Sequence, residues 1–353
     1  MYFHAGGRPC YRSSTTRVIE ISCSLGESGH VSGALQGKVA IVTGAGRGLG
    51  RTHALALADA GAAVVVNDLG VGMDGGGTDQ GPADTVVAEI AAAGGQAVTD
   101  SHDVSDWSEA KAIIDGALSA FGRLDIVVNN AGISRFAPIE EETHEGWSRT
   151  IGINLTGTAA VSHWAAAHWR ALGPERGRAI INTSSPAGAN PLPGTPAYCT
   201  SKAAVLALTI TCAADLADLG VRVNAIAPIA RTRMTEAVPE FADVVAPVSG
   251  SFDRIAPEHV SAVVVYLASE ACAFTGRAFG LEGDDLYLFS GFSASTHLNN
   301  GARQWTIDSL SAALSDVDRQ DRGYALEPGH RFVSPQPSDD VLVALARADT
   351  GGS

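Results

Sequence analysis

Short runs of apolar, β-branched residues alternate along the chain with longer segments rich in alanine and leucine. Continuous apolar runs of this length are typical of strands buried on both faces, and the segments between them predict crossover helices. The alternation therefore predicts an α/β fold: a Rossmann-like, doubly wound, mostly parallel sheet with helices on both faces. The clearest runs lie at residues 39–42, 63–66, 124–128, 178–183 and 221–228.

The same pattern divides the chain into three parts. Residues 1–34 are rich in Arg, Ser, Thr and Gly but have no helical apolar stripe, so we expect a disordered extension rather than an Arg-rich targeting peptide. Residues 35–290 carry the strand and helix pattern and predict one large domain. Residues 291–353 predict a C-terminal extension with one amphipathic helix at residues 306–314.

The end of the domain has weaker patterns. Residues 233–256 hold prolines and apolar residues without periodicity, and predict a mobile segment that covers the substrate. Residues 260–267 predict a helix, and residues 279–283 predict the last strand.

Composition removes several classes of function. A net charge of −14 argues against a nucleic-acid partner. Five cysteines without a CxxC pair predict neither a disulfide framework nor a zinc site, and favour a reducing, cytoplasmic location with no metal. No uninterrupted apolar run approaches the roughly 20 residues that span a bilayer, so no membrane partner is expected.

A glycine-rich turn follows the first predicted strand and precedes a helix that ends at Gly61. Strand, glycine loop and helix are the context in which such a turn binds a dinucleotide. The helix amino terminus offers N–H groups to the pyrophosphate, and the glycines let the backbone approach it. Cofactor contacts are predicted at Gly44, Arg47, Gly48, Leu49 and Gly50.

Asp68 stands at the end of the second predicted strand, where a carboxylate can bind the ribose hydroxyls of the cofactor. The same carboxylate repels a 2′-phosphate, whereas Arg47 in the glycine loop would attract one. A carboxylate in contact with the ribose should outweigh a flexible arginine. We therefore predict NAD rather than NADP.

Tyr198 and Lys202 are spaced i, i+4, which on a helix places both side chains on one face. A phenol has an ordinary pKa of about 10, and a neighbouring ammonium is expected to move that pKa toward the operating range. Ser185 stands just after the predicted strand at residues 178–183 and would bring a hydroxyl to the same edge of the sheet. The three groups together predict acid–base chemistry at a hydroxyl or carbonyl.

The order of the glycine loop, Ser185 and Tyr198-x-x-x-Lys202 resembles the classical short-chain dehydrogenase/reductase family. The resemblance implies hydride transfer between NAD and a secondary alcohol or ketone. It implies that Tyr198 is the acid–base, that Lys202 lowers its pKa and binds the nicotinamide ribose, and that Ser185 binds the substrate oxygen. Asn154 matches the family asparagine that holds a water in the proton relay.

Further cofactor contacts follow only from this resemblance. Asn129 is expected to brace the central sheet. The chain has Pro228-Ile229 where the family commonly has Pro-Gly, which weakens the expected backbone contact with the nicotinamide. The contacts implied are Asp103 and Val104 with the adenine, Asn130, Ala131 and Gly132 beside the cofactor, and Pro228 and Thr232 with the nicotinamide.

Residues 67–70, 94–98 and 225–235 resemble a narrower group, the dehydrogenase domain of peroxisomal type 2 multifunctional enzymes and their single-domain bacterial relatives. That resemblance implies a 3-hydroxyacyl-CoA substrate. Basic groups for CoA would be Arg135, Arg231, Arg233 and Arg254, although all four could equally be solvated surface residues.

Two alternatives remain at this point. One is a dehydrogenase of a free apolar alcohol, ketone or steroid-like compound, which Phe136 and residues 191–193 favour as well as they favour an acyl chain. The other is a non-catalytic NAD sensor or assembly subunit. The resemblance also implies a homodimer or homotetramer, paired through the helices that hold Asn154 and Tyr198; Trp164 and Trp169 could support that pairing or an internal core.

Overall fold

The computed structural model describes residues 33–70, 81–232, 252–289, 304 and 306–315. The contacts within the chain divide it into two units, residues 1–31 and residues 32–353, and all the described elements belong to the second. Most of both predicted extensions, and residues 233–251 of the predicted substrate cover, lie outside the described residues.

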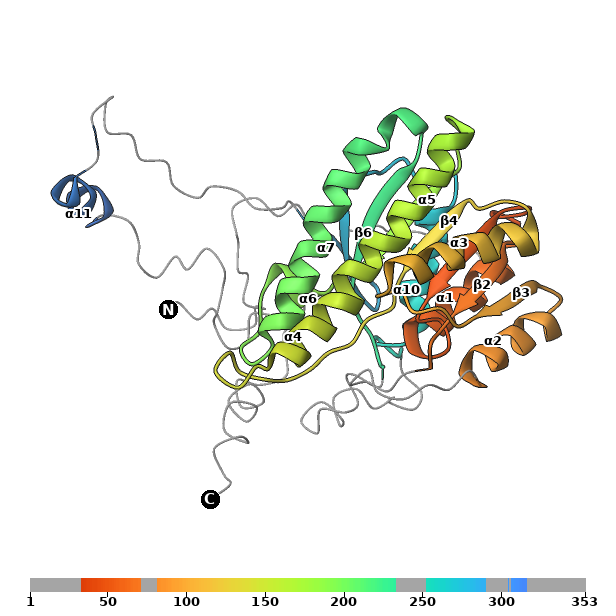
Figure 1. Cartoon of the computed structure of the whole chain (residues 1–353), viewed down its shortest axis with the longest axis horizontal. Coiled ribbons are helices and arrows are strands. Elements are labelled where there is room, and N and C mark those ends of the chain that lie inside the picture. Colours follow the sequence, from red (N-terminus) through yellow and green to blue (C-terminus); the bar gives the residue numbers. More distant parts are fainter. Residues whose placement is uncertain (1–32, 71–80, 233–251, 290–303, 305, 316–353) are drawn as a thin grey trace, which may run out of the picture. The chain divides into compact units, whose positions relative to one another are not determined.

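In the described part of the chain the strands form a single eight-stranded sheet with the order β3-β2-β1-β4-β5-β6-β7-β8 (Figure 1). Strands β1 to β7 are parallel, and β8 is antiparallel to β7. The order changes direction between β1 and β4, which places a ligand crevice at the carboxyl ends of the strands. The strands are β1 Val39–Thr43, β2 Ala63–Asn67, β3 Gln96–Asp100, β4 Ile126–Asn129, β5 Ala179–Thr183, β6 Arg222–Ile229, β7 Ala278–Glu282 and β8 Asp285–Leu288.

Helices connect the parallel strands and confirm the predicted doubly wound architecture. The helix that holds Tyr198 and Lys202 ends at Asp215, and a short 3₁₀ turn follows. The helices are α1 Gly48–Asp59, α2 Gly81–Ala92, α3 Trp107–Phe121, α4 His144–Ile151, the π-helix η1 Gly152–Gly157, α5 Thr158–Leu172, α6 Pro186–Ala189, α7 Pro196–Asp215, the 3₁₀ turn η2 Ala217–Leu219, α10 Pro257–Ala268 and α11 Ile307–Ser315.

The sheet is buried on both faces, which explains its continuous apolar strands. In β1, for example, Ala40 and Val42 pack toward α1, α2 and α10, while Val39 and Ile41 pack toward α3, α5 and α7. The second set of helices covers the face turned to the viewer in Figure 1. Trp169 of α5 is fully buried there and donates from Nε1 to the carbonyl of Leu124 at 2.8 Å, so its role is in the core.

The expected last strand is not the last one. After β7 the chain reverses through Gly283, whose φ of +61° suits a tight turn, and Asp284, and β8 pairs Asp285 with Glu282. A Gly-Asp pair between apolar runs is a hairpin signal. The alternating side chains of β8 are half exposed, which made its apolar pattern too short to predict a strand.

A buried polar ladder crosses the centre of the sheet. Asn129 at the end of β4 donates to Ser162 Oγ and to Asn182 Oδ1, both at 2.9 Å, and Asn182 on β5 donates to Thr209 Oγ1 at 3.0 Å. The ladder joins the two central strands to helices α5 and α7. It confirms the predicted bracing role of Asn129.

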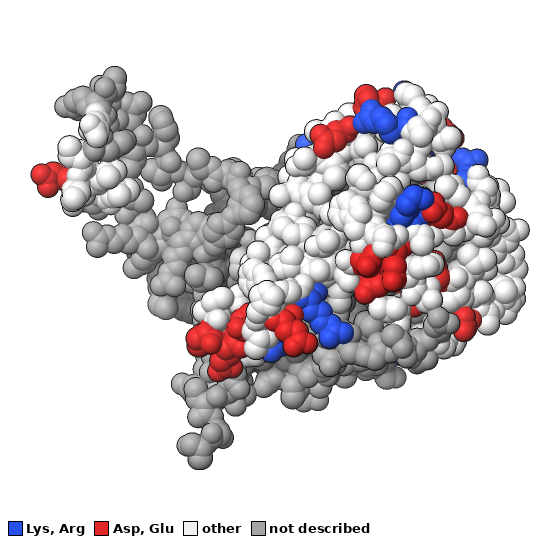
Figure 2. Space-filling model, viewed as in Figure 1, with Lys and Arg blue, Asp and Glu red and all other residues white. Residues whose placement is uncertain are grey.

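Helix α7 is unusually apolar for a helix with an accessible face. An 18-residue stretch of α7 has a mean hydropathy of 1.3, and 39% of that stretch is buried. Among the described helices, α7 alone is long and apolar enough to cross a membrane. Core helices pass the same test, and α7 packs against β5 and β6. Among the described residues its charged side chains are Lys202 and Asp215, and α5 contributes Arg170. Figure 2 shows the corresponding surface as largely free of charge.

Candidate active site

The glycine loop lies between β1 and α1, at the carboxyl edge of the sheet. Gly44 and Gly48 have φ values of +63° and +53°, which favour glycine. A Cβ on Gly50 would overlap the carbonyl oxygen of Gly44 and lie 2.6 Å from Asn130 Nδ2. Helix α1 begins without a side-chain cap or an acidic residue in its first turn. This backbone cradle therefore fits a dinucleotide pyrophosphate.

The end of β4 is bound to this loop by hydrogen bonds. Asn130 Nδ2 donates to the carbonyls of Thr43 and Gly44 at 3.0 and 3.1 Å, and the amides of Asn130 and Ala131 both donate to Thr43 Oγ1 at 3.0 Å. A Cβ on Gly44 would lie 2.8 Å from the Cα of Ala131. The structure thus brings together the predicted residues Gly44, Gly50, Asn130 and Ala131.

Asp68 reaches into the same loop. Its Oδ2 accepts from the amide of Gly46, and its Oδ1 accepts from the amide of Gly70, both at 2.7 Å. Because main-chain N–H groups hold both oxygens, the carboxylate is fixed at the first turn of the glycine loop. Each oxygen keeps a further lone pair that a ribose hydroxyl could use.

Other predicted cofactor residues lie around the loop. Asp103 Oδ1 accepts from the amide and hydroxyl of Ser105 at 2.8 and 2.7 Å, so its carboxylate already stabilises the turn before α3. Val104 is buried in the core. At the end of β6, Pro228 is partly exposed, and the Thr232 methyl would be 3.8 Å from a Cβ on Gly48. Arg47 and Leu49 are half-buried.

The predicted catalytic residues meet where β5 ends and α7 begins. Three consecutive residues at the end of β5 contact α7. The Thr183 carbonyl accepts from Lys202 Nζ at 2.8 Å, Ser184 Oγ donates to the carbonyl of Lys202 at 2.7 Å, and Ser185 hydrogen-bonds Tyr198 through its side chain. Ser185 also caps α6 by accepting from the amide of Ala187 at 3.1 Å. The structure therefore places a hydroxyl, a phenol and an amine in one cluster.

Burial changes the acid strengths of two of these groups. It lowers the pKa of Lys202 to about 8. Burial also raises the pKa of Tyr198, and the hydrogen bond with Ser185 acts in the opposite direction. The pKa of Tyr198 is therefore raised overall, and the expected lowering by Lys202 is wrong. Desolvation prevails because Lys202 Nζ lies 5.8 Å from the centre of the phenol ring and donates to Thr183.

Asn154 lies in the π-helix η1, a geometry found often at functional sites. Its Oδ1 accepts from the amide of Ile133 at 2.8 Å, and its Nδ2 donates to the carbonyl of Ile133 and to Ser201 Oγ, both at 3.0 Å. The side chain therefore fixes the segment after β4 against α7. A Cβ on Gly132 would lie 3.3 Å from both Asn154 Oδ1 and Lys202 Nζ, so these three residues converge.

Several residues of the cluster were missed from the sequence. Thr43, Thr183, Ser184 and Ser201 all make hydrogen bonds that position predicted site residues. Their signal was present, because each is a hydroxyl residue within two positions of a predicted site residue or strand end. The partner of each hydroxyl depends on which helix or strand packs against it, and the periodicity of the sequence does not reveal that packing.

The arginines considered for CoA are paired with carboxylates. Arg231 binds both oxygens of Asp253 at 2.6 and 2.8 Å, Arg254 binds Asp284 and Asp285 at 2.5 and 2.7 Å, and Arg135 binds Glu142 at 2.7 Å. Arg233 lies outside the described residues. These pairs cancel much of the positive charge that a polyanion would need.

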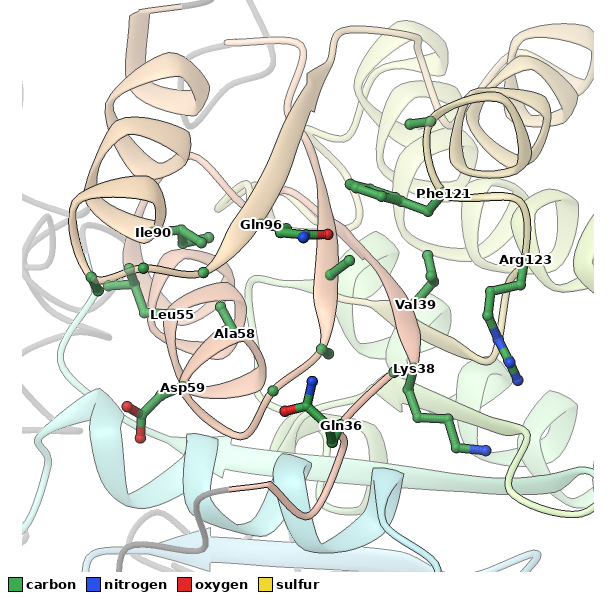
Figure 3. A pocket seen from close by; sticks show the side chains of 18 residues that line it. Gln36, Lys38, Val39, Leu55, Ala58, Asp59, Ile90, Gln96, Phe121 and Arg123 are labelled. Atoms are coloured by element: carbon green, nitrogen blue, oxygen red, sulfur yellow. The ribbon is translucent and has the colours of Figure 1, made fainter.

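A cavity of about 730 Å³ lies at the opposite, amino ends of β1, β2 and β3 (Figure 3). It contains none of the predicted site residues. Lys38 and Arg123 on its rim are both ion-paired with Asp125, at 3.8 and 2.6 Å. In the described part of the chain no cluster of three or more His, Cys, Asp or Glu side chains could hold a metal.

Known proteins show the same combination of fold and sequence. The family profile described as short chain dehydrogenase matches residues 38–243. The chain belongs to this family. It is therefore an oxidoreductase that acts on CH–OH groups, with a site for a nicotinamide cofactor.

The similar proteins include hydroxyacyl-CoA dehydrogenases. The chain is 38% identical to a Mycobacterium tuberculosis protein named hydroxyacyl-CoA dehydrogenase ChsB1, over 80% of this chain and 89% of that one. It is 39% identical to the peroxisomal multifunctional enzyme type 2 of Drosophila melanogaster, over 68% of this chain but 38% of that longer enzyme. A crystal structure of a short chain dehydrogenase from Mycobacterium avium superposes with a TM-score of 0.71 and 44% identity, and covers 80% of this chain and 95% of its own.

Proposed function

We propose that this short-chain dehydrogenase interconverts a secondary alcohol and a ketone with NAD, and that its substrate is a 3-hydroxyacyl-CoA. The observation that carries the reaction is the cluster of Ser185, Tyr198 and Lys202 at the end of β5, beside the glycine cradle. The chemistry that nicotinamide supplies when bound is acceptance of a hydride from the carbinol carbon.

In the oxidation direction Tyr198 takes the hydroxyl proton as phenolate. Its raised pKa means that the phenolate must be stabilised when it forms. With a pKa of about 8, Lys202 is still mostly charged at neutral pH and supplies a cation nearby. The capping bond of Ser185 uses only a lone pair, so the hydroxyl proton that it shares with Tyr198 can turn to a substrate oxygen. Ser185 can therefore hold the substrate oxygen as charge develops there.

The proton must then leave the cluster. Lys202 Nζ and Asn154 Oδ1 converge at Gly132, which supports a path away from Tyr198 on that side. We propose that Asn154, held by its hydrogen bonds to Ile133 and Ser201, binds a water molecule on this path. Ser201 Oγ also donates to the carbonyl of Tyr198 at 2.7 Å, so Ser201 links Asn154 to Tyr198.

The preference for NAD rests on Asp68. The carboxylate is held at the first turn of the glycine loop by two main-chain N–H groups, so it cannot turn away from a bound ribose without losing both bonds. A 2′-phosphate at that position would meet a fixed negative charge. Arg47, at the next position of the loop after Gly46, is the residue that would oppose this effect.

The name of the Mycobacterium tuberculosis relative supports the acyl-CoA substrate, and the exposed side chains of Phe136 and Leu192 fit an acyl chain. The ion pairs of Arg135, Arg231 and Arg254 weaken the case, since a CoA phosphate would have to compete with a carboxylate at each. A dehydrogenase of a free apolar alcohol uses the same cluster without these arginines. The two substrate classes are separated by experiment.

The deciding experiment measures steady-state turnover with NAD and with NADP on a length series of 3-hydroxyacyl-CoA thioesters and on free secondary alcohols. We expect the thioesters to be oxidised, with kcat/KM at least about tenfold higher for NAD. In the Asp68→Ser variant this preference should shrink by about tenfold, because the fixed charge is gone.

Activity on free alcohols alone would reject the CoA substrate and keep the mechanism. An Asp68→Ser variant with the wild-type NAD preference would reject the role of the carboxylate. NADH binding without turnover of any substrate would favour a nucleotide sensor.

We also propose that the protein self-associates as a homodimer or homotetramer through α5 and α7. The support is the apolar, largely uncharged surface of these helices, including Ile210, whose side chain is 56% exposed (Figure 2). Light scattering on the wild type and on Ile210→Asp tests this. A monomeric wild type would contradict it.

A further inference from the structure

Residues 190–195 connect the helix capped by Ser185 to the helix that holds Tyr198 in its first turn. Because Ser185 caps the helix before this loop and Tyr198 lies in the first turn of the helix after it, we expect the loop to lie beside the substrate carbinol. Its sequence is Asn-Pro-Leu-Pro-Gly-Thr, so Leu192 stands between two prolines that restrict the backbone. The Leu192 side chain is 48% exposed.

Cys199, one residue after Tyr198 on α7, makes hydrogen bonds to this loop through its thiol. Its buried Sγ accepts from the amide of Leu192 at 3.2 Å and lies 3.2 Å from Thr195 Oγ1. Thr195 Oγ1 in turn donates to the carbonyl of Leu192 at 2.9 Å. With the thiol donating to Thr195, the three bonds close a ring that satisfies both main-chain groups of Leu192. Leu192 is therefore held in one orientation by Cys199 and Thr195.

The other side of the loop holds Phe136. The carbonyl of Gly194 accepts from the amide of Ala137 at 2.8 Å, and Gly194 has a φ of +78°. A Cβ at Gly194 would overlap the ring of Phe136, so the ring packs directly on the glycine backbone. Phe136 remains 55% exposed in this position. Leu192 belongs to the anchored loop and Phe136 packs on it, so both large apolar side chains are held in place.

We propose that Leu192 and Phe136 form the wall that binds the apolar chain or ring of the substrate, and that Cys199 is the positioning residue that holds this wall. The inference rests on the proposed dehydrogenase function and adds the residues that set its specificity. An apolar group that packs on both side chains removes their exposed surface from water, and a wall ordered in advance loses little entropy on binding. The substrate class is an alcohol with an extended apolar substituent next to the carbinol carbon.

The test compares KM for a long and a short substrate of the same kind: decan-2-ol against butan-2-ol, and 3-hydroxydecanoyl-CoA against 3-hydroxybutyryl-CoA. In Phe136→Ala and Leu192→Ala we expect the preference for the long substrate to fall by about tenfold, because a large part of the apolar contact is removed. Cys199→Ala should shift the preference in the same direction, and Cys199→Ser should largely restore it, because a hydroxyl can complete the ring.

Cys212→Ala is the matched control, since Cys212 lies on the same helix away from the loop. A wild-type preference in Cys199→Ala would overturn the proposal, as would an equal loss of kcat on long and short substrates, which would indicate a disturbed Tyr198. A readout without turnover is hydrogen exchange at the Leu192 amide. We expect it to be faster in Cys199→Ala and unchanged in Cys212→Ala; unchanged exchange in both would reject the anchor.

These outcomes are distinct from a failure of the proposed function. A wild type that turns over none of the four substrates would reject that function. The exchange of the Leu192 amide would still decide whether Cys199 holds the loop.

Discussion

At the carboxyl ends of the strands, polar groups surround tight glycine turns, whereas at the amino ends they form ion pairs around a cavity. Lys202 and Tyr198 at the carboxyl ends have pKa values shifted by burial, which disfavours their charged forms. At the amino ends the pKa of Arg123 is raised chiefly by its hydrogen bonds with Asp125, which stabilise its charge. The cavity of about 730 Å³ lies at this second end.

The difference teaches that burial and ion pairing act on charged groups in opposite directions. Proton transfer requires groups whose two protonation states are close in free energy. Burial moves the pKa of Tyr198 away from neutral pH, but it moves Lys202 toward that condition. A satisfied ion pair moves its members away from it. The glycine turns add a second distinction, because a backbone that approaches a ligand closely has no room for a Cβ.

The largest effect is expected from a substitution in the catalytic cluster at the carboxyl ends of the strands. Tyr198→Phe should lower kcat by about a thousandfold, because no other group in the cluster can take the hydroxyl proton. Fluorescence titration should show NADH binding unchanged within about twofold, since the glycine cradle remains intact. Tyr266→Phe on α10 is the control. Turnover near the wild-type value in Tyr198→Phe would disprove the mechanism.

A smaller effect on NADH binding is expected to distinguish a glycine at the carboxyl ends of the strands from one at the amino ends. Gly50→Ala should raise the NADH dissociation constant by about tenfold or more, since its Cβ would overlap the carbonyl oxygen of Gly44 and displace the loop. Gly94, which lines the amino-end cavity, has a φ of +86° and no atom within 4 Å of its Cβ position. Gly94→Ala should cost about 1 kcal/mol of stability in urea unfolding and leave NADH binding unchanged. Equal effects on binding would refute the distinction.

A pH dependence of stability tests burial without catalysis. His53 on α1 is fully buried, its Nδ1 lies 2.8 Å from Ser261 Oγ, and burial lowers its pKa from 6.5 to about 3. Between these values the unfolded chain binds a proton that the folded protein does not. The free energy of unfolding should therefore fall as the pH falls through this window, by up to about 1.4 kcal/mol per pH unit.

Urea unfolding at several pH values measures this slope. His53→Gln should remove the His53 contribution, and the exposed His144→Gln is the control. An unchanged slope in His53→Gln would contradict the assignment. Activity profiles of wild type and His53→Gln should keep the same shape, because His53 is not in the catalytic cluster.

The elements nearest the site were the most predictable. The apolar run before the glycine loop is β1, and the run before Ser185 is β5, because strands buried on both faces need no partner-specific pattern. The short amphipathic segment near residue 310 is helix α11. Strand β8 was missed, since its side chains are half exposed and its pairing depends on the turn at Gly283.

The roles of single side chains were less predictable. Trp169 could have served a subunit contact and is buried in the core, and Arg254 could have served CoA and is paired with Asp284 and Asp285. In each case the partner is distant in sequence. Cys199 Sγ accepts from the amide of Leu192, a contact that no local pattern around Tyr198 indicates.

The sequence by itself determined the parallel sheet, the glycine cradle and the identity of Ser185, Tyr198 and Lys202, because these depend on local periodicity and on residue types that few other structures require. The tertiary structure alone decided the direction of the Tyr198 pKa shift, the bracing of Asn154 and the anchoring of Leu192. Desolvation and hydrogen-bond partners arise from elements that meet only in the folded chain, so no local pattern contains them.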